Sequence, residues 1–392
     1  MKKSKFLLSK SLPVFTSFVI LGFDDIVGVA TGFIKQDFNL TDDIAQLVPS
    51  MALFWFFVLA VPAGILQDRL GKKRMLNFGI FITGLGMLIP VIYYSFPLIM
   101  IAFVFLGIGN TIVHVSANPL LYDVSPKEKY SSYMSFSQFL KASISLLGPI
   151  ITTFVAIQFG DWKLVFAIYS ITSFLSAIWL YSTRIPEMKS KEEPATFSSC
   201  FSLLKNRFIL ALVLGIFMLV GADVGMNSNI ANFLMNRFEL SLENASLGIS
   251  LYFLALMIGR LLGAVILNWV SSQFFLLITS IIALTSLVSI MMAPTLIMTQ
   301  VAIFMVGLGS GNLFPLIFSL AIEHLPKRSN EISGLMIMAI SGGAVLPPIM
   351  GQISTNIGVK ESLIVLIVAM TYLVGLGIYS LKKYKYGYAR SN

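Results

Sequence analysis

Charged residues are scarce in this sequence. They make up 11% of its 392 residues, against about 25% in typical soluble domains. A water-soluble domain needs a polar surface, yet 57% of the residues here are hydrophobic. This composition excludes a soluble globular protein, a coiled coil and a disordered chain. We therefore predict a protein that spans a membrane several times.

Residues that bind metals or form disulfides are also nearly missing. The single cysteine, Cys200, excludes an internal disulfide, and two histidines beside it are too few for a metal cluster. An intramembrane aspartyl enzyme would need two converging carboxylates, whereas the adjacent Asp24 and Asp25 diverge from one helix. No small-residue cleavage site follows the basic N-terminus, so the first apolar run is expected to stay as an anchor. We expect no metal, no cofactor and no catalytic activity.

Long apolar runs are what the sequence has instead. A bilayer core of about 30 Å requires about 20 apolar residues in a helix. Twelve runs reach this length, at 11–34, 46–66, 75–94, 96–121, 131–157, 163–182, 207–236, 246–269, 273–292, 295–323, 330–354 and 361–381. They are continuous, which excludes the alternating strands of a barrel. The longest polar interruption predicts an N-terminal six-helix bundle at 1–182, a cytoplasmic central loop at 183–206 and a C-terminal six-helix bundle at 207–392.

The net charge of +9 is distributed unevenly between the two sets of span ends. One set carries only Lys35, Lys163, Arg237 and Lys360, and the other carries all the remaining basic residues outside the spans. By the positive-inside rule, this asymmetry places both termini in the cytoplasm. It also argues against a nucleic-acid partner. We expect a monomer in a bacterial inner (plasma) membrane, whose partners are the lipid bilayer and a small-molecule substrate.

Several ionisable residues fall inside the spans, where each costs roughly 2.5–3.5 kcal/mol on insertion scales. They are Asp24, Asp25, His114, Lys141, Asp223 and Arg260. Most lie in or near the middle third of the bilayer; Lys141, for example, is about 15 Å from the start of its span. We predict that they meet in one water-filled cavity. The candidates for proton coupling are Asp24, Asp25, His114 and Asp223, because these side chains can exchange a proton.

Uncharged polar residues recur on the same helix faces. Asn110, His114 and Asn118 are spaced four residues apart in one span, as are Asp223 and Asn227 in another. Such stripes suit a hydroxyl-rich ligand, and hydrogen bonds between helices are the alternative. The candidates for substrate binding are Asn110, Asn118, Gln138, Lys141, Asn227 and Asn312.

The stretch Gly64-Ile-Leu-Gln-Asp68-Arg69-Leu-Gly71-Lys72-Lys73-Arg74 follows the second apolar run. It resembles the loop signature of the major facilitator superfamily. Its glycines permit a close helix approach and a tight turn, and Asp68 suits the positive end of a neighbouring helix. Structural or gating roles are expected for Gly64, Asp68, Arg69, Gly71 and Arg260. The resemblance implies an all-α membrane protein with twelve transmembrane helices in two pseudo-symmetric six-helix bundles.

A second motif, Ser116-Ala117-Asn118-Pro119, resembles the Ala-Asn-Pro signature of the fucose–proton symporter family, which includes glucose/galactose transporters. The resemblance implies import of a monosaccharide such as glucose, galactose or fucose by proton symport with alternating access, driven by a proton gradient. His114 and Lys141 stand where the fucose symporter type has a Glu and an Asn, so the sugar and the proton carrier stay open. The alternative is an exporter of the same superfamily for a sugar or a small amphiphile.

Overall fold

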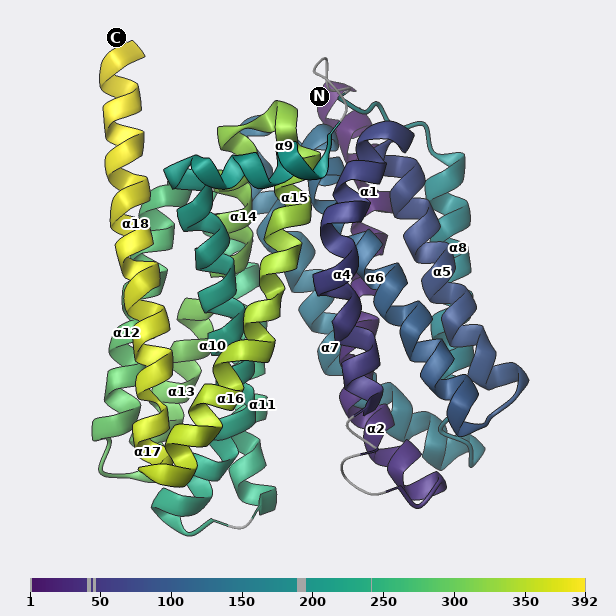
Figure 1. Ribbon diagram of the computed structural model, residues 1–392, viewed down its shortest axis with the longest axis vertical. Helices are drawn as coiled ribbons and strands as arrows, with labels where there is room; N and C mark the ends of the chain where they lie inside the picture. Colours follow the sequence, from purple (N-terminus) through teal and green to yellow (C-terminus); the bar gives the residue numbers. More distant parts are fainter. Residues whose placement is uncertain (1, 41–43, 45–46, 189–194, 241, 392) are drawn as a thin grey trace. The chain divides into compact units, whose positions relative to one another are not determined.

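The computed structural model describes residues 2–40, 44, 47–188, 195–240 and 242–391, which are almost entirely helical and contain no strand (Figure 1). The helices before the central segment are α1 (Lys2–Leu21), α2 (Ile26–Asp37), α4 (Leu47–Leu70), α5 (Lys72–Ile92), α6 (Phe96–Val124), α7 (Tyr130–Phe159) and α8 (Leu164–Ser182). The helices that follow are α9 (Phe197–Ser202), α10 (Arg207–Phe238), α11 (Leu242–Ile266), α12 (Ser272–Met292), α13 (Leu296–Ser310), α14 (Leu313–His324), α15 (Ser329–Met338), α16 (Gly342–Asn356), α17 (Val359–Ser362) and α18 (Ile364–Ser391).

The twelve predicted spans correspond to these helices. In the described part of the chain, ten helical segments are long and apolar enough to cross a membrane. The first predicted span, 11–34, consists of α1 and α2 with a short 3-10 turn between them, and the second, 46–66, is α4. The all-α membrane fold predicted from the apolar runs is confirmed.

Three of the predicted spans are interrupted rather than continuous. Gly22–Asp25 form a 3-10 turn (η1) between α1 and α2, and Ala339–Ser341 form another (η5) between α15 and α16. Gly311 and Asn312 separate α13 from α14. A break leaves backbone groups that must be bonded by protein or water inside a membrane, and transporters often place such breaks at their binding sites. The residues beside these breaks are therefore of particular interest.

Contacts divide the chain into two compact units. The first comprises Met1–Tyr130, Leu140–Leu203 and Leu325–Met338, and the second comprises Ser131–Phe139, Leu204–His324 and Ala339–Asn392. Each unit combines segments from both halves of the chain, whereas the predicted bundles at 1–182 and 207–392 are each continuous in sequence.

A hydrogen bond in each unit joins residues from different predicted bundles. The start of α7 belongs to the second unit, where the Ser132 hydroxyl donates to the carbonyl oxygen of Ala264. Helix α15 belongs to the first unit, where the Ser333 hydroxyl donates to the carbonyl oxygen of Val115 at 2.6 Å. The predicted bundle boundaries stay a prediction.

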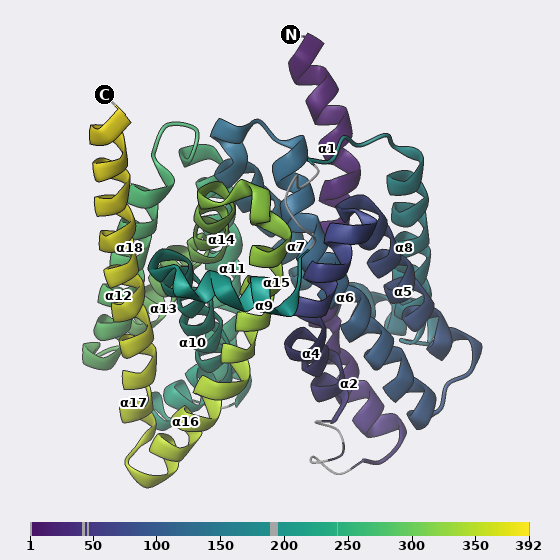
Figure 2. The same cartoon turned by 45° about the horizontal axis from the view of Figure 1, so that its top comes forward.

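In the first unit, α5 packs against α6 and α8, while α4 packs against α6 and α15 (Figure 2). Gly64 of α4 and Gly334 of α15 lie at a close approach of two helices. A Cβ on Gly64 would come within 2.8 Å of the Asn330 carbonyl oxygen, and one on Gly334 within 3.0 Å of the Ala60 carbonyl oxygen. Larger residues at either position would push α4 and α15 apart.

The second unit is built around α10, α11 and α12. Helix α12 runs beside α13 and α18, α11 packs against α13, and α10 packs against α16 and α18 (Figure 1). Helices α10, α11 and α13, which carry or adjoin the predicted polar residues of the second half, therefore share one unit.

The predicted central loop at 183–206 contains a short helix, α9, which lies against α15. A capping box begins α9, because the Thr196 hydroxyl accepts from the Ser199 N–H and the Ser199 hydroxyl accepts from the Thr196 N–H. The Ser199 hydroxyl also donates to the Glu331 carboxylate at 2.5 Å, and Arg328 donates to the Ser199 carbonyl oxygen at 2.7 Å. These bonds attach α9 to the first turn of α15.

Cys200 of α9 is fully buried, and its burial together with the nearby Glu331 carboxylate raises the pKa of the thiol to about 12. At pH 8 an ordinary thiol of pKa near 8.5 is about one quarter thiolate, whereas a pKa of about 12 leaves about one part in ten thousand. We expect N-ethylmaleimide, which reacts with thiolates, to label native Cys200 roughly two- to three-thousandfold more slowly than the denatured chain. Mass spectrometry over a time course measures this rate.

The matched control for this experiment is an exposed cysteine on the same helix. Phe197 is 57% exposed, so Phe197→Cys in a Cys200→Ser background should react at the rate of a free thiol. Equally fast labelling of Cys200 in the native chain would contradict the burial of α9. Because the folded chain holds this proton more tightly, the contribution of Cys200 to stability is complete below pH of about 8.5 and is lost as the pH rises toward 12.

Candidate transport sites in the two units

The predicted polar stripe of α6 is completely buried in the first unit. Asn110 accepts a hydrogen bond from the Thr83 hydroxyl of α5 at 3.3 Å, which favours the interhelical alternative for this residue. Asn118 donates to the carbonyl oxygen of His114 at 3.1 Å, while its Oδ1 atom is buried without a hydrogen-bond partner in the described part of the chain. Of these two asparagines, Asn118 is therefore the one with an acceptor available to a ligand.

Pro119 changes the hydrogen bonding of α6. Because proline has no N–H, the carbonyl oxygen of Val115, four residues earlier, loses its usual helical partner. Ser333 of α15 donates to this oxygen at 2.6 Å, and the Gln67 amide of α4 donates to it at 3.5 Å. The Ala-Asn-Pro motif thus creates an acceptor that joins three helices of the first unit.

Removing the Ser333 hydroxyl should destabilise this junction. We expect Ser333→Ala to lower the free energy of unfolding by about 1 kcal/mol, or the melting temperature by about 2 °C, because the buried Val115 oxygen keeps only the longer bond from Gln67. Thermal unfolding of the purified protein in detergent measures the change. Ser182→Ala is the control, since the Ser182 hydroxyl bonds only within its own exposed helix end, and an equal loss there would refute the role of Ser333.

His114 is 3% exposed and lies in the same unit as Lys141. The Phe56 ring of α4 meets the imidazole edge to face at 5.5 Å between centroids, and Lys141 is close enough to act on His114 electrostatically. The η1 turn packs on α7 at the same level, because a Cβ on Gly22 would lie 2.9 Å from the Lys141 carbonyl oxygen. The first unit therefore gathers His114, Lys141 and the break in the first span.

The side chains of Asp24 and Asp25, the other two predicted proton carriers of this half, lie outside the described residues. The backbone places both in η1, the turn that Gly22 begins. Their roles stay predictions.

Asp223 of α10 is bonded to a neighbouring helix of the second unit. Its carboxylate accepts from the Tyr252 hydroxyl of α11 at 2.5 Å, and the Arg260 guanidinium acts on it electrostatically. Asn227, one turn further along α10, is exposed. Sequence reasoning missed Tyr252. Its position two helical turns before Arg260 on the same face of α11 is the signal that could have identified it.

Arg260 donates a hydrogen bond to a backbone oxygen at the break in the tenth span. Pro315 has no N–H, so the carbonyl oxygen of Gly311 loses its helical partner, and Arg260 Nε donates to it at 3.2 Å. Arg260 Nη1 donates to the Gln138 carbonyl oxygen of α7 at 3.4 Å. These bonds favour the predicted structural role of Arg260.

Asn312 is part of the same break. Its amide donates to the carbonyl oxygen of Gly259 on α11, which favours a packing role for this predicted substrate-binding residue. Gln138 is also buried, and its side-chain Nε2, like the Oδ1 of Asn312, has no hydrogen-bond partner among the described residues, so both atoms are available to a ligand.

A family model described as Major Facilitator Superfamily matches residues 14–348. The chain belongs to the major facilitator superfamily. Members of this superfamily are membrane transporters rather than enzymes. The resemblance inferred from the loop signature is therefore confirmed, and so is the major facilitator fold.

Relatives and a solved structure in the major facilitator superfamily match over nearly the whole chain. A glucose/galactose transporter of Brucella abortus biovar 1 (strain 9-941) is 24% identical over 360 residues, which cover 88% of this chain and 87% of that protein. A putative glucose/galactose transporter of Helicobacter pylori (strain ATCC 700392 / 26695) is 27% identical over 372 residues, covering 88% and 89%. A crystal structure of the E. coli fucose:proton symporter has a TM-score of 0.82 at 19% identity, covering 94% of this chain and 97% of that chain.

The superfamily's loop signature connects α4 and α5. Gly71 adopts a φ of +94° in the turn, a conformation that favours glycine. Asp68 accepts from the Asn330 amide at 2.9 Å, in the first turn of α15, and from the Ala195 N–H at 3.0 Å. Asp68 therefore binds the start of a neighbouring helix of the first unit, whereas Arg69 is exposed.

Each unit of this major facilitator protein holds its own cluster of predicted site residues. The first unit brings together His114, Lys141, Asn118 and the η1 turn; the second brings together Asp223, Arg260 and Gln138 with Tyr252. A single cavity shared by all of them stays a prediction. Among the described residues, no group of three or more His, Cys, Asp and Glu side chains is arranged to hold a metal ion.

Proposed function

We propose that this protein is a secondary transporter that imports a monosaccharide by proton symport with alternating access. Relatives that match 88% of the chain carry the names glucose/galactose transporter and putative glucose/galactose transporter, which supports a hexose as the substrate class. We place the protein in a bacterial plasma membrane as a monomer with both termini in the cytoplasm, and the proton gradient is its driving force.

The observation that carries this proposal is the position of two titratable groups inside the spans of the first unit. His114 is buried in α6, and Lys141 is half buried in α7 directly beside the η1 break of the first span. Charged or titratable groups are costly in a membrane, and beside a broken helix they are typical of transporter binding sites. A protein that only spans the membrane would have no use for them.

The residues divide into three roles under this proposal. Asn118, Gln138, Lys141 and Asn227 contact the sugar hydroxyls. His114, Asp24, Asp25 and Asp223 are the groups among which the proton carrier lies. Asn110 and Asn312 hold helices together through their bonds to Thr83 and Gly259.

Transport by the purified protein in proteoliposomes tests the proposal. With an inward proton gradient, uptake of radiolabelled glucose, galactose or fucose should exceed the equilibrium level and should fall to that level when a protonophore is added. Sugar-dependent alkalinisation of the external medium should accompany uptake. Accumulation that a protonophore does not change would refute proton coupling.

Direction is tested separately in intact cells. A strain expressing the protein should accumulate the sugar and show counterflow when preloaded with the unlabelled compound. Faster loss of preloaded sugar from expressing cells, without accumulation, would instead support the alternative of an exporter.

A further inference from the structure

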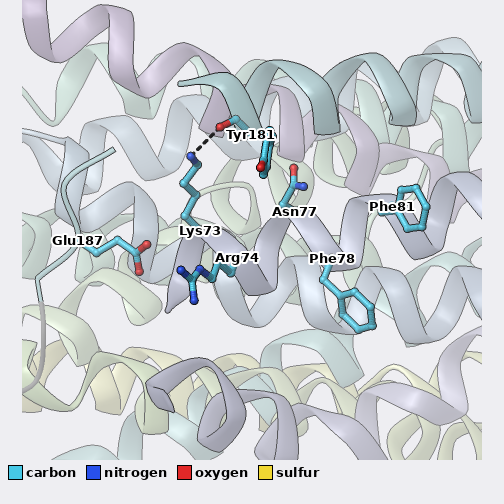
Figure 3. A pocket seen from close by; sticks show the side chains of 7 residues that line it. All are labelled: Lys73, Arg74, Asn77, Phe78, Phe81, Tyr181 and Glu187. Carbon is cyan, nitrogen blue, oxygen red and sulfur yellow. Dashed lines mark hydrogen bonds between the residues drawn. The ribbon is translucent and has the colours of Figure 1, made fainter. Parts of the chain in front are cut away.

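A pocket of about 500 Å³ lies in the first unit beside the loop signature (Figure 3). Helix α5 supplies most of its wall through Lys73, Arg74, Asn77, Phe78 and Phe81. These residues recur at intervals that place them on one face of the helix. The remaining wall comes from Tyr181, near the end of α8, and from Glu187, which follows α8 in the chain.

The lining of the pocket changes from basic to aromatic side chains along α5. Lys73 and Arg74 lie in the first turn, at the end of the helix predicted to be cytoplasmic, and Phe78 and Phe81 lie one to two turns further into the span. The two phenylalanines are 51% and 44% exposed, although they lie within a membrane-spanning helix. Their exposed rings therefore face lipid rather than water. The pocket is therefore basic at one end and apolar further along the same face of α5.

The charges of Lys73 and Arg74, the two cations that line the pocket, are less fully neutralised than the charge of the neighbouring Lys72. Lys72 is fully occupied by a buried ion pair with Asp123 at 2.8 Å. Lys73 donates to the backbone oxygen of Tyr181 at 2.9 Å (Figure 3), and its charge has no counter-ion among the described residues. Arg74 is exposed and has no hydrogen bond or ion pair with any part of the chain that the structure describes. Its five N–H groups remain available.

Two further groups decide what kind of anion fits. The carboxylate of Glu187 accepts the Lys72 backbone N–H at 2.6 Å, so the lining carries two cations and one carboxylate and has a net charge of +1. The Oδ1 atom of Asn77 is buried and lacks a hydrogen-bond partner within the described residues. A ligand with one negative charge and a hydroxyl donor would match both features.

We propose that this pocket binds the headgroup of an anionic phospholipid with a single phosphate charge and hydroxyl groups, such as phosphatidylglycerol. Arg74 and Lys73 bind the phosphodiester, Asn77 accepts a hydrogen bond from a glycerol hydroxyl, and the acyl chains run along Phe78 and Phe81. Basic pockets at the cytoplasmic ends of membrane helices are known sites for anionic headgroups. A free phosphate has the same charge chemistry but makes no use of the aromatic wall.

Native mass spectrometry of the purified full-length protein tests this proposal. The protein is titrated with phosphatidylglycerol and with phosphatidylcholine of the same acyl chains, and phosphatidylglycerol should bind at least about tenfold more tightly. The double variant Lys73→Gln/Arg74→Gln should weaken phosphatidylglycerol binding by about thirtyfold and leave phosphatidylcholine binding unchanged. Arg237→Gln/Lys360→Gln, which removes the same charge from exposed positions in α10 and α17, is the control and should change neither.

A second set of measurements separates a lipid from a free phosphate. Phe78→Ala/Phe81→Ala should weaken phosphatidylglycerol binding, whereas inorganic phosphate in large excess should not displace the lipid. Displacement by inorganic phosphate, or equal lipid binding by the wild type and the Lys73/Arg74 variant, would overturn the proposal. Should the double variant not remain monodisperse, the exposed Arg74→Gln alone should cause a loss of about fivefold, and an unchanged affinity there would also overturn it.

Discussion

Replacing Lys141 by alanine is expected to weaken sugar binding by about 10- to 100-fold and to reduce uptake at low sugar concentration in proportion. Lys141 is half buried in α7 and adjoins the η1 turn through Gly22. A hydrogen bond from a charged group contributes about 1.5–3 kcal/mol, which corresponds to this range of affinities. Removing the ammonium group also makes α7 roughly 2.5–3.5 kcal/mol easier to insert, so the amount of protein should not fall.

Binding and uptake need to be measured separately for this variant. Sugar binding to purified protein is followed by intrinsic fluorescence, and uptake is followed in proteoliposomes. Lys163→Ala is the matched control, because Lys163 lies at a loop and pairs with the partly exposed Asp161 at 3.4 Å. Lys141→Arg should retain part of the affinity, since it keeps the charge. Normal binding by the alanine variant would exclude Lys141 from the sugar site.

Replacing Asp223 by asparagine is expected to abolish proton-driven accumulation while sugar exchange continues. Asparagine can still accept the hydrogen bond from Tyr252, which spans 2.5 Å in the native protein, but it cannot bind and release a proton. The proposed coupling requires a carboxyl group that alternates between two charge states. Accumulation above equilibrium should therefore fall to the level seen with a protonophore, whereas counterflow should stay within about twofold of the wild type.

The companion variant Tyr252→Phe separates the proton from its partner. It removes the hydroxyl donor and keeps an ionisable Asp223, so proton coupling should persist. The affinity for the sugar should fall by roughly tenfold, and the pH dependence of transport should shift. Asp161→Asn, at a partly exposed loop position, is the control. If Asp223→Asn still accumulates sugar and alkalinises the medium, the proton carrier is one of the first-unit candidates, His114, Asp24 or Asp25.

The proline motifs show where sequence reasoning reaches its limit. Pro119 and Pro315 occupy the fourth apolar run of each half of the chain, and from the sequence alone each can be expected to free the carbonyl oxygen four residues earlier. The sequence does not tell which donor meets that oxygen. In the structure Ser333 donates to the first and Arg260 donates to the second, and these donors lie far away in the chain.

Contacts between distant segments also decide which candidate polar residues join helices and which remain available to a ligand. Asn110, Asn118 and Asn312 look alike in the sequence, because each is an asparagine within an apolar span. Asn110 bonds to Thr83 and Asn312 to Gly259, both on neighbouring helices, whereas the Asn118 amide bonds within its own helix to His114. The Oδ1 atoms of Asn118 and Asn312 are both buried without a partner among the described residues. Only the neighbouring helix distinguishes a residue that joins helices from one that is available to a ligand.

The sequence by itself determined the membrane class, the approximate positions of the spans, and the superfamily, because hydropathy and loop signatures depend on residues that are adjacent in the chain. The tertiary structure alone decided that spans 1, 10 and 11 are broken, that α9 interrupts the central loop, and that Tyr252 partners Asp223. These features depend on which buried donor meets which buried acceptor. Where an apolar bundle excludes water, a missing partner is not replaced, so packing between distant segments determines the outcome.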